Sequence, residues 1–171
     1  MSTVRIESVD DATDDIVQQL ASVLVDAVTG GASVSFMSDL QFDEAADWWR
    51  QTLSASPSRA VVLVARDEQD IVGTVQLQPS WAPNQVHRAD VAKLIVHRRA
   101  RGRGIARTLM QEIERRAREQ RFTLLVLDTC EGSAAEKLYT SLGWVRVGVI
   151  PHYALNPDGT PCDTVYFYKQ L

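Results

Sequence analysis

Cysteine, long apolar runs and a signal-peptide core are scarce or missing in this sequence. Its two cysteines, Cys130 and Cys162, are too few and too far apart to suggest a disulfide framework or a metal site, so we expect two reduced thiols. No apolar run approaches the ~20 residues that a membrane-spanning helix needs. The N-terminal residues, MSTVRIESVDDATDD, turn acidic where a signal peptide has its apolar core. The sequence therefore predicts a cytoplasmic protein with no membrane contact and no bound metal.

Aromatic residues are absent from the basic part of the chain. Residues 98–121 contain nine arginines and three glutamates, a net charge of +6, whereas the whole chain carries −4. Surfaces that bind single-stranded nucleic acid stack bases on aromatic side chains, and a long polyanion would meet repulsion from the acidic remainder. The segment therefore favours a compact polyanionic ligand over nucleic acid. For its later arginines, solvation of an exposed helix face is the alternative.

Internal repeats, low-complexity tracts and an evident domain boundary are also missing. A length of 171 residues with 45% hydrophobic and 23% charged residues suits one globular domain over residues 1–171. The hydrophobic periodicity predicts the order β-αα-ββ-β-α-β-α-ββ, typical of a single α/β domain with a mixed sheet. The uninterrupted apolar run at 124–127 indicates a strand buried on both faces. Strands are expected at 4–7, 59–66, 71–77, 90–97, 124–127, 144–150 and 165–169, and helices at 11–28, 43–53, from 105 and from 134 to 142.

A turn rich in arginine and glycine, Arg99-Ala-Arg-Gly102-Arg-Gly104, separates the strand at 90–97 from an amphipathic helix that begins at Ile105. The first N–H groups of a helix lack intrahelical partners, and the helix dipole makes that end positive, so it can seat a phosphate. Glycines let the backbone approach such a ligand closely. A dinucleotide fold would need a third glycine at Arg107, and the Gly-Lys-Ser/Thr of a Walker loop is absent. A surface turn with solvated arginines is the alternative.

This turn resembles the motif Gln/Arg-x-x-Gly-x-Gly/Ala of the GNAT family of acyl-CoA-dependent N-acetyltransferases, and the order of elements is similar as well. The resemblance implies a mixed, mostly antiparallel sheet of about seven strands flanked by about four helices. It also implies acetyl-CoA as co-substrate, with the pyrophosphate on the turn and the pantetheine arm along a splayed strand before it. The coenzyme-binding residues implied are Leu94, Ile95, Val96, Arg99, Arg101, Gly102, Arg103, Gly104, Ile105, Ala106 and Arg107.

A second segment, Gly132-Ser-Ala-Ala-Glu-Lys-Leu-Tyr139, resembles the family's Asn-x-x-Ala-x-x-Leu-Tyr. Gly132 stands in place of the asparagine that helps to hold the pantetheine arm, and Ser133 could substitute for it. The resemblance makes Tyr139 the acid that protonates the departing thiolate; a tyrosine packed in the core is the alternative. Asp128 and Asp90 are the candidate bases. An acid directly after four apolar residues is either paired structurally or poised for function.

The segments 30–40, 131–136, 150–153 and 157–159 together resemble the tabtoxin-resistance branch of the family, whose acceptor is a small amino-acid-like toxin. We therefore expect transfer of an acetyl group to a primary amine of a small molecule, such as an amino-acid-like antibiotic or toxin. The alternatives are a protein or peptide N-acetyltransferase and a non-catalytic acyl-CoA-binding module. A homodimer is one assembly to consider. The acceptor-site candidates are Ser33, Phe36, Met37, Trp81 and Tyr153, of which Phe36 and Met37 could instead be ordinary hydrophobic anchors.

Overall fold

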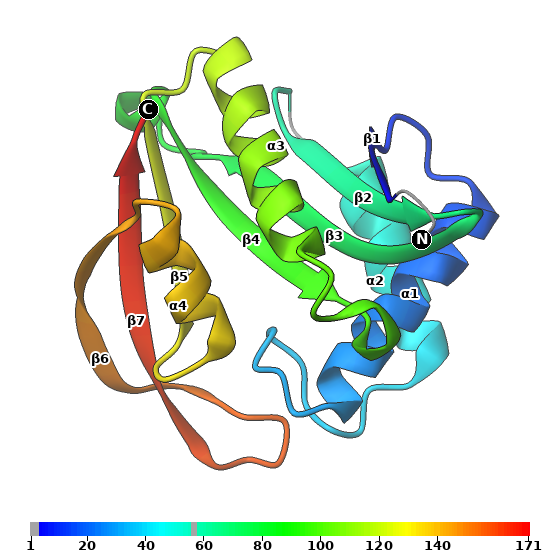
Figure 1. Cartoon of the computed structure of the whole chain (residues 1–171). Coiled ribbons are helices and arrows are strands. Elements are labelled where there is room, and N and C mark those ends of the chain that lie inside the picture. The colour runs from blue at the N-terminus through cyan, green and yellow to red at the C-terminus, as the bar shows by residue number, and fades with distance from the viewer. Residues whose placement is uncertain (1–3, 56–57) are drawn as a thin grey trace.

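The structure, a computed structural model, describes residues 4–55 and 58–171. Its centre is a seven-stranded sheet with the spatial order β1-β2-β3-β4-β5-β7-β6 (Figure 1). Neighbouring strands are antiparallel except for β4 and β5, which run parallel. The strands are β1 (Arg5–Ser8), β2 (Val61–Asp67), β3 (Asp70–Pro79), β4 (Arg88–Val96), β5 (Leu124–Cys130), β6 (Val145–Leu155) and β7 (Pro161–Gln170).

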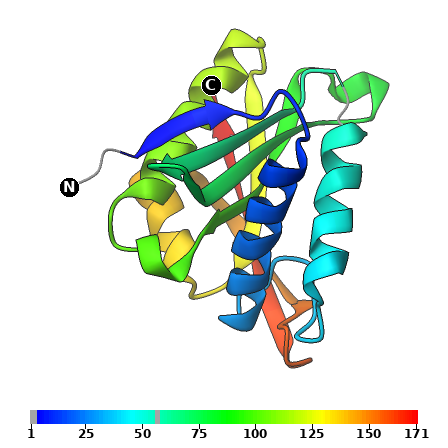
Figure 2. The same cartoon turned by 90° about the vertical axis from the view of Figure 1, so that its right-hand side faces the viewer.

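Helices cover both faces of this sheet. On one face lie α1 (Asp14–Thr29) and α2 (Phe42–Ser54), whose buried Leu20, Leu24 and Trp49 form a core with β2 and β3 (Figure 2). On the other lie α3 (Ile105–Glu119) and α4 (Ala134–Ser141). The apolar face predicted for the α3 helix is confirmed, because Ile105, Leu109, Met110, Ile113 and Ala117 are all buried. Short 3-10 turns occur at Pro83–Gln85 and Arg98–Ala100.

The predicted fold class is thus confirmed, with one correction at β5. Leu125 and Leu127 are buried, whereas Leu124 and Val126 are only partly buried. The strand was expected to be buried on both faces. It alternates instead, because α1 and α2 pack against the strands at the β1 side of the sheet and do not form a core with β5.

A bulge in β4 opens the sheet where the site lies. On β3, Thr74 pairs with Ile95 and Gln76 pairs with Ala92, so two β4 residues oppose one residue of β3. Lys93, one of the two, has a φ of 52°. The parallel pairing of β4 with β5 covers only the residues from Arg88 to Asp90, and beyond it the two strands diverge (Figure 1). A bulge bends its strand and increases the local twist, which accounts for this separation.

Candidate active site

The space between the diverging strands holds a cavity of about 370 Å³. Its walls come from six segments far apart in sequence: residues 33–37 after α1, 91–94 of β4, 128–130 of β5, two residues of α4, 153–155 of β6 and Thr164 of β7. Seven predicted site residues meet here: Leu94 of β4, predicted to bind the coenzyme, and six that were predicted for catalysis or acceptor binding. The six are Ser33, Phe36, Met37, Asp128, Tyr139 and Tyr153.

The two candidate bases have different surroundings. The Asp90 carboxylate accepts from Arg88 Nη1 at 2.8 and 3.0 Å. Asp128 lines the cavity and has no ion-pair partner within 4 Å among the described residues. It touches solvent through the open side of the cavity, yet the surrounding protein desolvates it and raises the pKa of its carboxyl, with Lys93 opposing and Asp90 adding to that shift. Asp128 is therefore the carboxylate free to take a proton.

Tyr139 reaches the same cavity from α4. Only 5% of the residue is exposed, and its ring packs beside Trp144 and Phe167 with centroids 6.1 and 5.9 Å away. Burial, and secondly the charge of Asp128, raises the pKa of Tyr139 above its ordinary value, so the phenol stays protonated at neutral pH. Its hydroxyl makes no hydrogen bond to the residues that the structure describes. A buried proton donor without an internal partner can donate to a bound ligand.

The glycine turn lies at the start of α3, where Gly102 and Gly104 have φ values of 76° and 78°. L-residues with a side chain rarely adopt this conformation, so the turn requires glycine. A Cβ at either position would meet no atom within 4 Å, which shows that the space beside the backbone is open. The first hydrogen bond of the helix runs from Thr108 N–H to the Gly104 carbonyl. The N–H groups of Gly102, Gly104, Ile105 and Ala106 have no acceptor within the part of the chain described.

The sequence profile of the Acetyltransferase (GNAT) family matches residues 24–144, well over half of the chain. The chain belongs to the GNAT family of acetyltransferases. Acetyl-CoA is the co-substrate typical of that family. Human N-acetyltransferase 8B is 37% identical over 87 residues, which are 50% of this chain and 38% of the human protein. The chain therefore matches well under half of that relative's length.

Solved structures of the same fold cover nearly the whole chain. Ribosomal-protein-alanine N-acetyltransferase from Brucella melitensis superposes with a TM-score of 0.81 at 24% identity, covering 98% of this chain and 99% of that one. A proposed acetyltransferase from Salmonella typhimurium, solved with its cofactor acetyl-CoA, gives 0.80 at 19% identity and covers 99% and 95%. These likenesses confirm the GNAT fold. They do not single out the tabtoxin-resistance branch.

The arginines of the GNAT turn fall into two groups. Arg99 and Arg103 form ion pairs with Asp70 and Asp67 of the β2–β3 hairpin, at 2.8 and 2.5 Å. Arg101 and Arg107 instead line a groove of about 220 Å³ with Gly102 and Gly104. The donor set of this groove, glycine N–H groups and two guanidinium groups, fits the pyrophosphate of coenzyme A. Leu138 of α4 and Val96 of β4 also line this groove, and Leu94 of β4 lines the cavity.

Ser133 has a structural role at the start of α4. Its hydroxyl accepts the Glu136 N–H at 3.3 Å, as the N-cap of the helix, and shares a hydrogen bond of 3.2 Å with the Thr129 hydroxyl. These contacts engage the group that was expected to replace the family's asparagine as a coenzyme ligand. Gly132 has a φ of 76°, in the left-handed region that glycine and asparagine both tolerate. Gly132 therefore lacks the side-chain amide of the family's asparagine in a backbone conformation that asparagine also tolerates.

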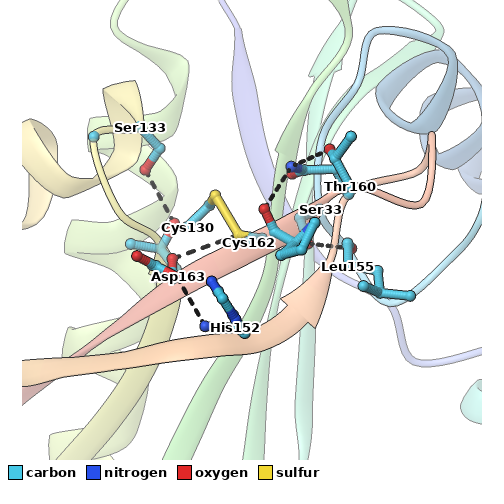
Figure 3. The surroundings of a disulfide bond; sticks show 12 residues. Ser33, Cys130, Ser133, His152, Leu155, Thr160, Cys162 and Asp163 are labelled. Atoms are coloured by element: carbon cyan, nitrogen blue, oxygen red, sulfur yellow. Dashed lines mark hydrogen bonds between the residues drawn. A yellow bond between two sulfur atoms is a disulfide. The ribbon is translucent and has the colours of Figure 1, made fainter.

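Both cysteines were expected to be reduced thiols, and this prediction is wrong for the structure. Cys130 and Cys162 form a disulfide between the ends of β5 and β7, with Cα atoms 6.1 Å apart (Figure 3). Cys130 lines the cavity. The cysteines are 32 positions apart in sequence, and the pairing could not be predicted because the sequence does not show that β5 and β7 are neighbours.

Trp81 lies away from the cavity, which corrects its assignment to the acceptor site. It is 93% exposed in the loop between β3 and β4, next to the start of β4, whereas the cavity lies along the later half of that strand. The sequence shows that Trp81 is an aromatic residue in a loop, but it does not show that this loop lies at the end of β4 away from the cavity. Sequence reasoning also missed Lys93, whose side chain lies in the cavity wall. The sequence signal for it was a lysine within an otherwise apolar strand.

Two further observations concern ligands and membranes. Within residues 4–55 and 58–171, histidine, cysteine, aspartate and glutamate form no group of three that could hold a metal ion. No described helix is both long enough and apolar enough to cross a membrane.

Proposed function

We propose that this GNAT acetyltransferase transfers the acetyl group of acetyl-CoA to a primary amine of a small molecule. The observation that carries the proposal is the cavity between β4 and β5, which Asp128 and Tyr139 both line. Its volume lies within the ~300–1,000 Å³ typical of small-molecule pockets. Residues 33–37 and the 153–155 part of β6 enclose it, which favours a compact acceptor over a peptide that needs an open groove.

The proposed roles follow from charge and protonation. Acetyl-CoA supplies the acetyl group as a thioester. In a ternary complex the amine nitrogen attacks the carbonyl carbon directly, so that a C–N bond forms and the C–S bond breaks with release of the thiolate. Asp128 takes a proton from the acceptor amine, directly or through water, because its carboxylate is unpaired and its pKa is raised. The negative charge of Asp90 helps to raise the pKa of Asp128. Asp90 itself forms an ion pair with Arg88. Tyr139 donates its proton to the departing thiolate.

The backbone of β4 is proposed to bind the pantetheine arm and the thioester carbonyl. Beyond Asp90 its groups on the β5 side have no strand partner, because the parallel pairing ends there. We assign Leu94, Ile95 and Val96 to the pantetheine arm, and their edge of the strand to the carbonyl oxygen on which negative charge develops. Arg101, Gly102, Gly104, Ile105, Ala106 and Arg107 hold the pyrophosphate. Arg99 and Arg103 act indirectly by fixing the turn to the β2–β3 hairpin.

Thiol release from acetyl-CoA tests the proposal directly. The wild-type protein is assayed against amino acids, aminoglycosides, polyamines and short peptides, with Asp128→Asn as the impaired variant and Asp158→Asn, in the β6–β7 turn, as the control. Turnover with small amines that falls at least tenfold only in Asp128→Asn supports the proposal. Turnover with peptides alone would make the chain a peptide acetyltransferase. Binding of acetyl-CoA without turnover of any amine would make it a binding module.

We further propose that the protein is cytoplasmic and that residues 1–171 form a single domain. We also propose that two copies form a homodimer through β6. β6 is an edge strand of the sheet, and its exposed apolar residues include Val147, Tyr153 and Leu155, at 67, 52 and 51%. Exposed apolar patches on edge strands mark association surfaces. Sedimentation equilibrium should show a dimer that Val147→Lys converts to a monomer, and a monomeric wild type would exclude it.

A further inference from the structure

The cavity contains one charged residue that the proposed mechanism does not use. Among the residues that line it, Lys93 and Asp128 carry the charges, on the two strands that diverge. Each affects the pKa of the other, yet no ion pair within 4 Å joins them in the described structure. The cavity therefore presents an ammonium group and a carboxylate group that do not neutralise each other by contact.

The ammonium group of Lys93 is held in place by neutral groups. Nζ donates to the Ser35 hydroxyl at 2.9 Å and lies 5.9 and 5.6 Å from the ring centroids of Phe36 and Trp48. An ammonium has three N–H donors, so two of them lack an acceptor among the residues described. Burial lowers the pKa of Lys93, as expected for a partly desolvated cation without a bound carboxylate.

The backbone at both ends of this hydrogen bond is unusual. Ser35 and Lys93 have φ values of 78° and 52°, in the left-handed region that residues with a side chain rarely occupy. Such conformations cost free energy and cluster at ligand-binding and catalytic sites. Here the bulge in β4 and the segment after α1 bring the serine hydroxyl and the lysine ammonium together at the cavity wall.

We propose that Lys93 binds a carboxylate of the acceptor, so that the preferred substrates are amines that also carry a carboxylate, as amino acids do. The acceptor amine then lies toward Asp128 and its carboxylate toward Lys93, and a zwitterion between the two strands satisfies both charges. Ser35 and the two aromatic rings act as positioning groups for the ammonium. This inference rests on the proposed function, because it concerns the acceptor of the same reaction.

Matched acceptors test the role of Lys93. We would measure kcat/KM for α-, β- and γ-amino acids, each beside its carboxamide and its decarboxylated amine, at saturating acetyl-CoA. The variants are Lys93→Met, which removes the charge at similar length, and Lys93→Arg, which retains it. Lys137→Met, on the exposed side of α4, is the matched control. The acid-to-amide ratio, compared between variants, cancels differences in the intrinsic reactivity of the amines.

The wild type should favour the carboxylate-bearing member of at least one pair by roughly ten- to a hundredfold, the effect of one charged hydrogen bond. Lys93→Met should bring that ratio close to one, because the carboxylate-bearing acceptor loses its partner whereas its carboxamide loses none. Lys93→Arg should retain part of the preference. A wild type without such a preference, or a Lys93→Met variant that slows both members of a pair equally, overturns the proposal. If Lys93→Met does not fold, the wild-type and Lys93→Arg ratios decide. A wild type that acetylates no amine refutes the proposed function instead.

Discussion

Replacing Tyr139 with phenylalanine removes one hydroxyl from the cavity and little else. The ring is 95% buried against Trp144 and Phe167, and the hydroxyl makes no hydrogen bond to a described residue. Tyr139→Phe therefore keeps the packing and leaves no protein group without its partner. We expect the free energy of unfolding to change by less than about 1 kcal/mol, since the hydroxyl faces the cavity and no hydrogen bond within the protein is lost.

The same substitution should have a large effect on turnover. A positioned general acid contributes about 10² to 10⁴-fold, so we expect kcat to fall at least about a hundredfold with a nearly unchanged KM for acetyl-CoA. Because the pKa of Tyr139 is raised above its ordinary value near 10, wild-type kcat should show no loss from its ionisation up to about that pH. The assay is release of free thiol at saturating amine, beside urea unfolding of the same preparations.

The control is Tyr168→Phe, a half-buried tyrosine of β7 that does not line the cavity. It should keep wild-type kcat. If Tyr139→Phe retains more than a third of wild-type kcat while folding normally, the tyrosine is a packing residue and the acid must be another group or solvent.

Four other substitutions test the site and its support. Gly104→Ala puts a side chain in a left-handed conformation that costs about 1–2 kcal/mol. The free turn should relax away from that conformation, and restoring it on binding should weaken coenzyme A binding by about tenfold in calorimetry; unchanged affinity would contradict the assignment of the turn. Because the pKa of Asp128 is raised, kcat/KM should fall as the pH decreases through a value above the ordinary aspartate range. Asp128→Asn should abolish this acidic limb of the pH profile. The variant should be at least as stable as the wild type at neutral pH, because the fold disfavours the charged form of Asp128. Glu114→Ala breaks a buried ion pair with a lysine of β7 and should lower unfolding free energy by about 3 kcal/mol in urea titrations. Joint replacement of Cys130 and Cys162 by serine should cost about 3 kcal/mol without reductant, and the wild type in reductant should then match the variant.

Local patterns predicted the elements well because each depends on neighbours in sequence. The five apolar positions of α3 repeat with the helical period, and all five are buried. The glycine turn was equally accessible, since positive φ and free N–H groups follow from glycine and from the start of a helix. The buried strand β5 was predicted in the right place but with the wrong burial, because burial depends on which helices cover it.

What the sequence could not provide is the relation between segments. Asp90 and Asp128 were equivalent candidates until Arg88 was found on one of them, and that pairing is a contact of side chains. The disulfide, the role of Ser133 and the exposure of Trp81 likewise depend on strand order and loop direction.

The sequence by itself determined the donor side of the chemistry. Its turn, its Tyr139 helix and its element order are short-range patterns, and together they identify a GNAT acetyltransferase and its coenzyme. Only the tertiary structure shows the cavity on which the proposed acceptor side rests, because it is built from six segments that meet through the bulge and divergence of β4. That meeting places Lys93 across from Asp128. Opposite charges on two diverging strands are a property of the fold, and the proposed zwitterionic acceptor rests on them.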